Sequence, residues 1–281
     1  VRIPPSPQGE KGSAGEMDRH NLGRHCVLGL ALWWGILWGQ PPDAALDTVY
    51  ALAAHRLPAG EPVWVSGESL MDQPYGFTRI ENDSAESFTL LQVAVHGYGS
   101  QGYEWVVPLV KLSKRARYTF LYRYDWEVCP QETARELASS LTALIHRTPG
   151  VEKLVLFGHS YGGIVVTFCA GLLHLSIPVE VNAIAAPLAG IPGLLETCDL
   201  SFHPDSTVVY PGWDSTVVHL QWKTQHLLDN AFNKLPEDPQ EVHLPLSHPY
   251  LLPPTMDGHR LGHNWSVTWV VDEYLGVPHR R

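Results

Sequence analysis

Positive charge is scarce in this chain. It carries 19 Lys and Arg residues against 29 Asp and Glu residues, which gives a formal net charge of −10 at pH 7. A surface that binds nucleic acid needs basic residues to neutralise the phosphates. We therefore expect no nucleic-acid partner for this protein.

Cysteine is also scarce, with four residues in a chain of 281. The spacing of Cys26, Cys129, Cys169 and Cys198 is too irregular for a zinc ribbon or a CxxC redox pair. A chain of this length builds a core that needs no disulfide. The cysteines therefore do not indicate whether the protein resides in an oxidising or a reducing compartment.

The chain also lacks a pattern typical of a metal site. His259 and His263 have the i, i+4 spacing of metal-binding pairs on helices, but Gly262 between them argues against a continuous helix. No carboxylate stands at motif spacing as a third ligand. We predict neither a metal site nor a cofactor.

The first 45 residues differ in composition from the remainder. Residues 1–16 are rich in Pro, Gly, Ser and charge, which predicts disorder. Arg19 and Arg24 then precede an apolar run at 26–39 that is typical of a secretory signal. The run is shorter than the roughly 20 residues of a membrane-spanning helix. We expect a tail (1–45) that directs export or membrane association, with a cytoplasmic location as the alternative, and one folded domain over 46–281.

Within that domain, short β-rich runs alternate with helical patterns. This order predicts a mainly parallel sheet that helices cover on both faces. We expect strands at 62–66, 76–80, 87–95, 118–124, 153–157, 179–185, 206–210 and 241–246. We expect helices at 131–147, 162–175 and 263–275. We find no internal repeat.

The pentapeptide GHSYG (158–162) stands between a strand pattern, KLVLF, and a helix pattern, GIVVTFCAGLL. In a sharp turn from strand to helix, glycines on both sides of Ser160 let the two elements pass closely while the serine adopts a strained backbone conformation. The turn exposes the serine hydroxyl at the carboxyl edge of the sheet. The setting predicts that Ser160 is a nucleophile.

Several runs resemble the α/β-hydrolases, and the lipases and esterases among them. LVLFGHSYGG (154–163) resembles their nucleophile elbow, and VAVHGYG (93–99) resembles the loop after their third strand. YRYDW (122–126) is similar to a run in some lipases and acyltransferases, and AAPLAGIPG (185–193) resembles the turn after their sixth strand. The resemblance covers about residues 60–281 and implies an α/β-hydrolase fold. Glu127 follows YDW where such acyltransferases carry Arg, so we do not extend acyltransferase activity to this chain.

The resemblance implies a catalytic triad in the chain order serine, acid, histidine. Asp214 follows the predicted strand at 206–210 and the turn Pro211–Gly212, so we predict it as the acid. The alternatives are Asp199, Asp205 and Asp229. The first two precede that strand, and Asp229 lies in a predicted helix.

The base stays open among several histidines. The family places it in a loop after the last strand, directly before the terminal helix. His263 fits this position, because Gly262 allows a tight turn and a helix pattern follows at once. His248 directly follows the predicted strand at 241–246, and His259 is a third candidate. We predict His263.

Two backbone N–H groups of the family stabilise the oxyanion of the tetrahedral intermediate. We assign them to Tyr98, in the His-Gly loop, and to Tyr161, after the nucleophile. Residues 100–105 continue that loop and would line the acyl pocket. The connection at 186–207 has room for a short helix at 190–198, so we expect a small lid or none.

These features predict a serine hydrolase that cleaves carboxylic esters through an acyl-enzyme on Ser160. The substrate would be a small-molecule or lipid ester. A thioesterase uses the same triad and is the alternative. A non-catalytic binding protein on the same scaffold is a further alternative, which the presence of Ser160, Asp214 and His263 in order disfavours.

Overall fold

The buried apolar runs of the sequence form the centre of a sheet. The computed structural model describes residues 50–57, 63–191, 193, 195 and 197–279, so the predicted tail (1–45) lies outside the described residues. Residues 154–157 in strand β5 (Lys153–His159) expose none of their surface. Such a run fits a strand that is covered on both faces.

Eight of the described strands form one sheet, in the order β1-β2-β4-β3-β5-β6-β7-β8. Strands β4, β3, β5, β6, β7 and β8 are mutually parallel, whereas β2 pairs antiparallel with β4. The bounds are β1 (Tyr50–Ala53), β2 (Gly76–Glu81), β3 (Ser87–Val95), β4 (Ala116–Arg123), β6 (Val179–Ile184), β7 (Val217–Lys223) and β8 (Ser247–Leu251). The predicted mainly parallel sheet is confirmed.

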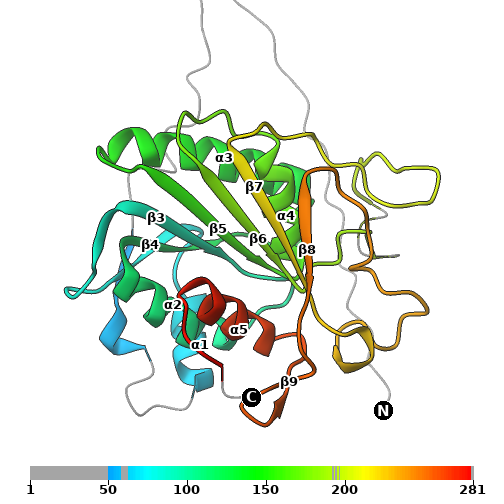
Figure 1. Cartoon of the computed structure of the whole chain (residues 1–281). Coiled ribbons are helices and arrows are strands. Elements are labelled where there is room, and N and C mark those ends of the chain that lie inside the picture. Colours follow the sequence, from blue (N-terminus) through cyan, green and yellow to red (C-terminus); the bar gives the residue numbers. More distant parts are fainter. Residues whose placement is uncertain (1–49, 58–62, 192, 194, 196, 280–281) are drawn as a thin grey trace, which may run out of the picture. The chain divides into compact units, whose positions relative to one another are not determined.

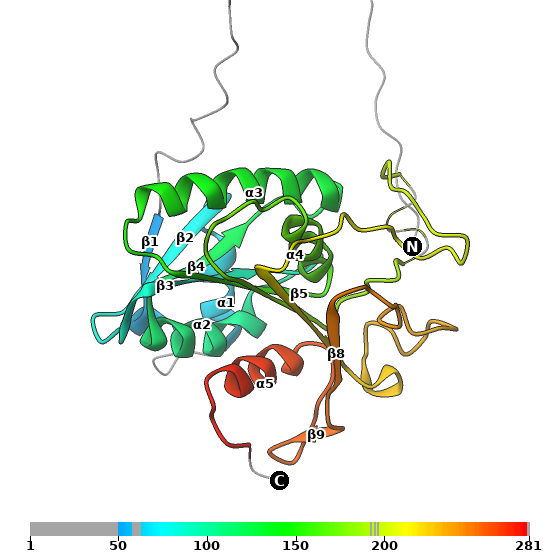
Figure 2. The same cartoon turned by 45° about the horizontal axis from the view of Figure 1, so that its top comes forward.

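Helices cover both faces of this sheet (Figures 1 and 2). Helices α3 (Pro130–Arg147) and α4 (Tyr161–Ala170) lie on one face and share a buried apolar core with it. Helices α1 (Val63–Met71), α2 (Tyr103–Arg115) and α5 (Trp265–Tyr274) lie on the other face around a second core. Because the sheet is parallel, its carboxyl edge gathers the loops that follow β3, β5, β7 and β8.

Three strand predictions are wrong. Residues 63–71 form α1, in which Val63, Trp64 and Val65 are exposed. Residues 206–210 join no strand of the sheet, although Val208 makes an isolated bridge to Phe202. The last strand of the large sheet is β8, which begins after the predicted run at 241–246. In each case a short β-branched or alternating run lacks the neighbours that a strand needs.

Helix α2 and strand β7 are among the elements that were not predicted. Helix α2 begins directly after Gly102, which has a φ of 79°. Strand β7 (VVHLQWK) carries His219 and Gln221 among its buried residues. Because these residues are polar, the sequence does not show the apolar pattern of a buried strand.

The long connection between β6 and β7 contains no helix in its described residues. The predicted helix at 190–198 is replaced there by turns and bends. A disulfide joins Cys198 in this connection to Cys129, which precedes α3. Two smaller strands, β9 (Thr255–Met256) and β10 (His259–Arg260), pair between β8 and α5. None of the described helices is long and apolar enough to cross a membrane.

Three of the histidines that the structure describes are buried. Burial lowers the pKa of His96 to about 4 and that of His219 to about 4, and it holds the pKa of His159 well below its ordinary value. Thr167 donates its hydroxyl to a carbonyl and lies 3.0 Å from Nε2 of His219, while the Ser247 hydroxyl lies 2.8 Å from Nδ1. Both ring nitrogens of neutral His219 are therefore paired.

We predict that the folded state weakens as the pH falls from 7 to 5. The unfolded chain binds a proton at each of these histidines below about pH 6.5, whereas the folded chain does not until the lower folded pKa. His96 and His219 should each remove about 2 kcal/mol from the free energy of unfolding over this interval.

Urea unfolding of the wild type and of His219→Gln at pH 7 and pH 5 checks this prediction. The variant lacks one titrating group, so its loss of stability on acidification should be smaller. Equal losses in the two proteins would contradict the assignment of His219 as a buried neutral group.

Candidate functional site

Ser160 lies in a strained turn between β5 and α4. Its φ is 54° and its ψ is −121°, which a residue other than glycine rarely adopts. The Ser160 N–H donates to the carbonyl of Ile184 in β6 at 2.9 Å, and its carbonyl accepts from Gly163 at 2.9 Å. The predicted sharp turn from strand to helix is confirmed.

The glycines of GHSYG are required by close contact of backbones. A Cβ at Gly158 would lie 2.3 Å from the carbonyl oxygen of Gly162. A Cβ at Gly162 would lie 2.4 Å from the carbonyl oxygens of both Val95 and His96. No larger residue fits at either position, so the spacing of the motif has a steric cause.

Ser160 and His263 line one cavity of about 210 Å³ at the carboxyl edge of the sheet. Every lining side chain other than glycine carries a polar group. The lining residues are Gly97, Tyr98, Gly99, Ser100, Gln101, Tyr103, Glu104, His159, Ser160, His263 and Asn264. The structure thus brings together the predicted nucleophile, the predicted base and Tyr98.

His263 is paired with Asp229, which is fully buried. Nδ1 of His263 lies 3.0 Å from Oδ2 of Asp229. The same oxygen accepts the hydroxyl of Thr224 at 2.5 Å, and Oδ1 accepts the N–H of Ala231 at 2.9 Å. Burial alone would raise the pKa of Asp229, but these hydrogen bonds and the charge of His263 outweigh burial and lower the pKa. Asp229 is therefore held as a carboxylate against the imidazole.

Asp214, which we predicted as the acid, does not reach this cavity. It is exposed, and its Oδ1 accepts the backbone N–H and the hydroxyl of Thr216 at 2.8 and 2.5 Å. It precedes β7, whereas the cavity lies past the other end of the strands, roughly 20 Å away for a strand of this length. Asp229 follows β7 and the short 3-10 helix His226–Leu228, so the assignment of Asp214 is wrong.

The other candidates lie elsewhere. His248 is an exposed residue of β8 opposite Leu220. His259 is exposed in β10 and stacks on Trp265 at 5.3 Å between ring centroids. Asp199 and Asp205 are both exposed in the β6–β7 connection. Among the described acids, Asp229 carries the hydrogen bond to His263.

His159 contributes a contact that the sequence did not indicate. Its Nε2 lies 3.1 Å from the backbone carbonyl of His263, and the two rings lie 4.6 Å apart. A carbonyl only accepts, so Nε2 carries the proton. The residue before Ser160 therefore fixes the backbone of the loop that bears His263.

The loop after β3 is held by the side chain of His96. The backbone N–H of Tyr124 donates to Nε2 of His96 at 3.3 Å, which leaves the proton on Nδ1. Nδ1 lies 2.9 Å from the carbonyl of Gly97 and donates to it. In a trans peptide the N–H points opposite to the carbonyl, so this bond also sets the direction of the Tyr98 N–H.

Gly97 brings that loop against the serine. A Cβ at Gly97 would lie 2.9 Å from the Cβ of Ser160 and 3.6 Å from its Oγ. On the other side, Tyr161 is the first residue of α4, and N–H groups in the first turn of a helix have no acceptor within the helix. The two predicted N–H donors thus flank Ser160.

Helix α2 forms a wall of the cavity. Residues 100–105 were predicted as a continuing loop, but 103–105 belong to α2, and Trp105 is buried in the core. Glu104 is buried and accepts the hydroxyl of Ser100. Burial raises the pKa of Glu104. Asn264 donates to the hydroxyl of Tyr103 at 2.6 Å, which links this wall to the loop of His263.

No cluster of three or more potential metal ligands occurs in the described part of the chain. A larger cavity of about 910 Å³ lies between the β6–β7 connection and residues 235–241, and none of the predicted site residues lines it. The smaller cavity, which Ser160 and His263 line, is therefore the candidate active site.

Comparison with known proteins agrees with this architecture. The family model described as "Alpha/beta hydrolase family" matches residues 92–275. A poly(3-hydroxybutyrate) depolymerase from Bordetella parapertussis has 14% identity and a TM-score of 0.47, covering 75% of this chain and 86% of its own. A carboxylesterase from Bacillus subtilis has 13% identity and a TM-score of 0.45, covering 76% of this chain and 95% of its own.

No functionally curated relative matches the sequence. With TM-scores below 0.5, the two solved structures support no conclusion about this chain. The family match spans well over half of the chain and includes the strand-turn-helix of Ser160 and the loop of His263. The chain belongs to the alpha/beta hydrolase family.

Proposed function

We propose that this protein is a serine hydrolase that cleaves carboxylic esters through an acyl-enzyme on Ser160. The observation that carries the proposal is the pair of His263 and buried Asp229, with 3.0 Å between Nδ1 and Oδ2, because His263 also lines one cavity with the strained Ser160. A serine hydroxyl needs a base, and the base needs an orienting acid. These three residues supply that set in the family's chain order.

The pairing assigns a role to each nitrogen of His263. Nδ1 donates to Asp229, which leaves Nε2 free of its proton and able to accept the proton of the Ser160 hydroxyl. Oγ then attacks the ester carbonyl carbon, and the N–H groups of Tyr98 and Tyr161 stabilise the oxyanion. His263 returns the proton to the leaving alcohol. Water hydrolyses the acyl-enzyme by the same steps.

The environment of Asp229 suits an orienting acid. It is fully buried and carries a lowered pKa, so it stays charged while His263 gains and loses a proton. In a region of low dielectric, a fixed carboxylate stabilises the imidazolium more strongly than an exposed one. Asp214 is exposed and therefore could not stabilise an imidazolium in this way.

The lining of the cavity supports a short or polar acyl group. Its volume is about 210 Å³, and none of its lining residues is aliphatic. A long alkyl chain would cover these polar side chains without offering them a hydrogen bond, which costs free energy. Esters with small or hydroxylated acyl groups meet this lining better.

The proposal includes export or membrane association, as the apolar run at 26–39 predicts. The Cys129–Cys198 disulfide supports it, because structural disulfides persist in oxidising compartments. Non-reducing mass spectrometry of the protein from its native compartment tests this part of the proposal. Two free thiols at these positions would count against export.

We predict that a fluorophosphonate probe labels Ser160. The base-activated hydroxyl should attack the phosphorus in folded protein and not in urea-unfolded protein. Ser160→Ala should lose both the label and hydrolysis of p-nitrophenyl acetate. Absence of labelling in folded wild-type protein would remove the proposed activity.

We predict that Asp229→Asn lowers kcat/KM at least about 100-fold, because the amide favours the wrong tautomer of His263. Asp214→Asn is the matched control and should stay within about 2-fold of the wild type, since Asp214 is exposed and bonds only Thr216. Steady-state kinetics on p-nitrophenyl esters distinguishes them. The reverse order of effects would restore Asp214 as the acid.

We predict that kcat/KM falls from acetyl to octanoyl p-nitrophenyl esters and that a hydroxyacetyl ester is a better substrate than its propionyl analogue. The polar lining around Glu104 is the physical reason. The matching acyl thioesters in the same assay separate esterase from thioesterase. A rise in kcat/KM with chain length would contradict a polar acyl site.

A further inference from the structure

We propose that one loop, residues 124–129, positions both predicted oxyanion donors and that the Cys129–Cys198 disulfide fixes its end. We call these residues the support segment. The inference rests on the proposed function, because it concerns the geometry around Ser160 during ester hydrolysis. It also assigns a role to Glu127, which follows YDW where the similar acyltransferases carry Arg.

The support segment first contacts the loop after β3. Tyr124 uses both its backbone and its side chain: its N–H donates to Nε2 of His96 at 3.3 Å, and its hydroxyl donates to the His96 carbonyl at 2.7 Å. The two rings stack with centroids 4.4 Å apart. Three residues later, Glu127 accepts the hydroxyl of Tyr98 at 2.9 Å. The loop that carries the Tyr98 N–H is thus held at two points.

The support segment next contacts the residue after the nucleophile. The hydroxyl of Tyr161 donates to the carbonyl of Val128 at 3.0 Å. Tyr161 exposes only 3% of its surface, and this bond is partly buried, unlike the exposed bond of Tyr98. The rings of Tyr98 and Tyr161 meet edge to face at 6.3 Å. Successive residues of one loop therefore bond the side chains of two tyrosines, and the backbone N–H groups of the same tyrosines flank Ser160.

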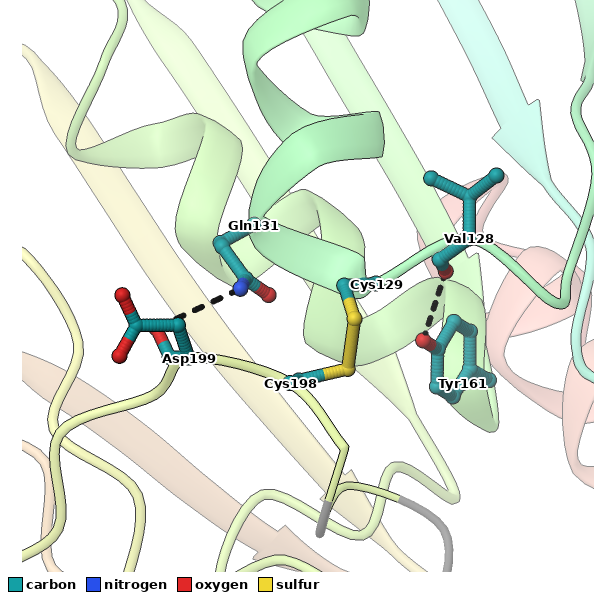
Figure 3. The surroundings of a disulfide bond; sticks show 6 residues. All are labelled: Val128, Cys129, Gln131, Tyr161, Cys198 and Asp199. Atoms are coloured by element: carbon teal, nitrogen blue, oxygen red, sulfur yellow. Dashed lines mark hydrogen bonds between the residues drawn. A yellow bond between two sulfur atoms is a disulfide. The ribbon is translucent and has the colours of Figure 1, made fainter.

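The disulfide ends the support segment. Cys129 directly follows Val128 and is bonded to Cys198, 69 residues further along the chain, in the β6–β7 connection (Figure 3). Figure 3 shows Tyr161 beside Val128 and the disulfide between α3 and that connection, where Gln131 also donates to the Asp199 carbonyl at 3.5 Å. A covalent link fixes the carbonyl that Tyr161 uses.

The consequence of this arrangement is kinetic. An oxyanion site works when its N–H groups stand ready where charge develops, and small displacements weaken it steeply. The ester carbonyl carries little charge before attack, so loosening the donors affects the transition state more than substrate binding. Loss of the support segment's contacts should lower kcat and leave KM nearly unchanged.

Tyr161→Phe tests the inference on a single hydrogen bond. It keeps the backbone N–H and removes the bond to Val128. We expect kcat to fall roughly 3- to 10-fold, with KM within about 2-fold, and the Ki of a trifluoromethyl ketone, which forms a tetrahedral adduct on serine, to rise by a similar factor.

The matched control is Tyr210→Phe. Its hydroxyl donates to the Leu188 carbonyl at 3.0 Å, the same kind of bond, but it contacts neither Tyr98 nor Tyr161. It should retain wild-type kcat and Ki. Wild-type kcat and Ki in folded Tyr161→Phe would overturn the inference.

The double variant Cys129→Ser, Cys198→Ser tests the covalent part. We expect kcat to fall at least about 3-fold at a temperature where circular dichroism shows a folded protein, and we expect dithiothreitol to reproduce this fall in the wild type but not in the variant. A folded variant with wild-type kcat would overturn the role of the disulfide.

Fluorophosphonate labelling separates this inference from the proposed function. A wild type that is labelled and active, with variants of unchanged kcat, overturns the support segment and leaves the esterase proposal standing. A wild type that is neither labelled nor active overturns both. A labelled wild type with variants of lowered kcat supports both.

Discussion

The close approach of strand β5 to helix α4 at Ser160 is the constraint on which the rest of the site depends. Gly158 and Gly162 have no space for a side chain. A Cβ at Gly158 would meet the backbone of Gly162, and a Cβ at Gly162 would meet the carbonyls at the end of β3. The same contact therefore fixes two distances at once, from β5 to α4 and from Ser160 to the His96–Tyr98 loop. Ser160 keeps its positive φ because the surrounding backbone leaves it no alternative conformation.

This constraint explains why the elbow and its neighbouring loop were predictable from the sequence. Glycine spacing, a buried strand before Ser160 and an apolar helix after it are local features, and each reflects a local steric demand. The mainly parallel sheet followed from the alternation of strand and helix patterns for the same reason. His263 was predicted as the base because its place before the last helix is also a local pattern.

The acid was not predictable in this way. Its position depends on which run forms the strand after β6, and STVVY at 206–210 has more strand character in its sequence than VVHLQWK at 217–223. The second run nevertheless forms the strand. Its buried polar residues have partners in the fold, since His219 pairs with Thr167 and Ser247, and these partners cannot be seen in the sequence. Once β7 is placed, the carboxyl edge of the sheet leads to Asp229 and away from Asp214.

The buried polar groups around Ser160 share one property: each is neutral or paired, and each directs a backbone or a ring. His96 turns the Gly97 peptide, His159 holds the carbonyl of His263, and Asp229 holds its ring. Such groups cost stability when acid protonates them, yet an apolar residue could not set the direction of an N–H or a carbonyl. Part of the fold's stability thus depends on pH because the geometry of the site is built from buried hydrogen bonds. Sequence patterns do not reveal those bonds, since their partners are brought together only by the packed sheet.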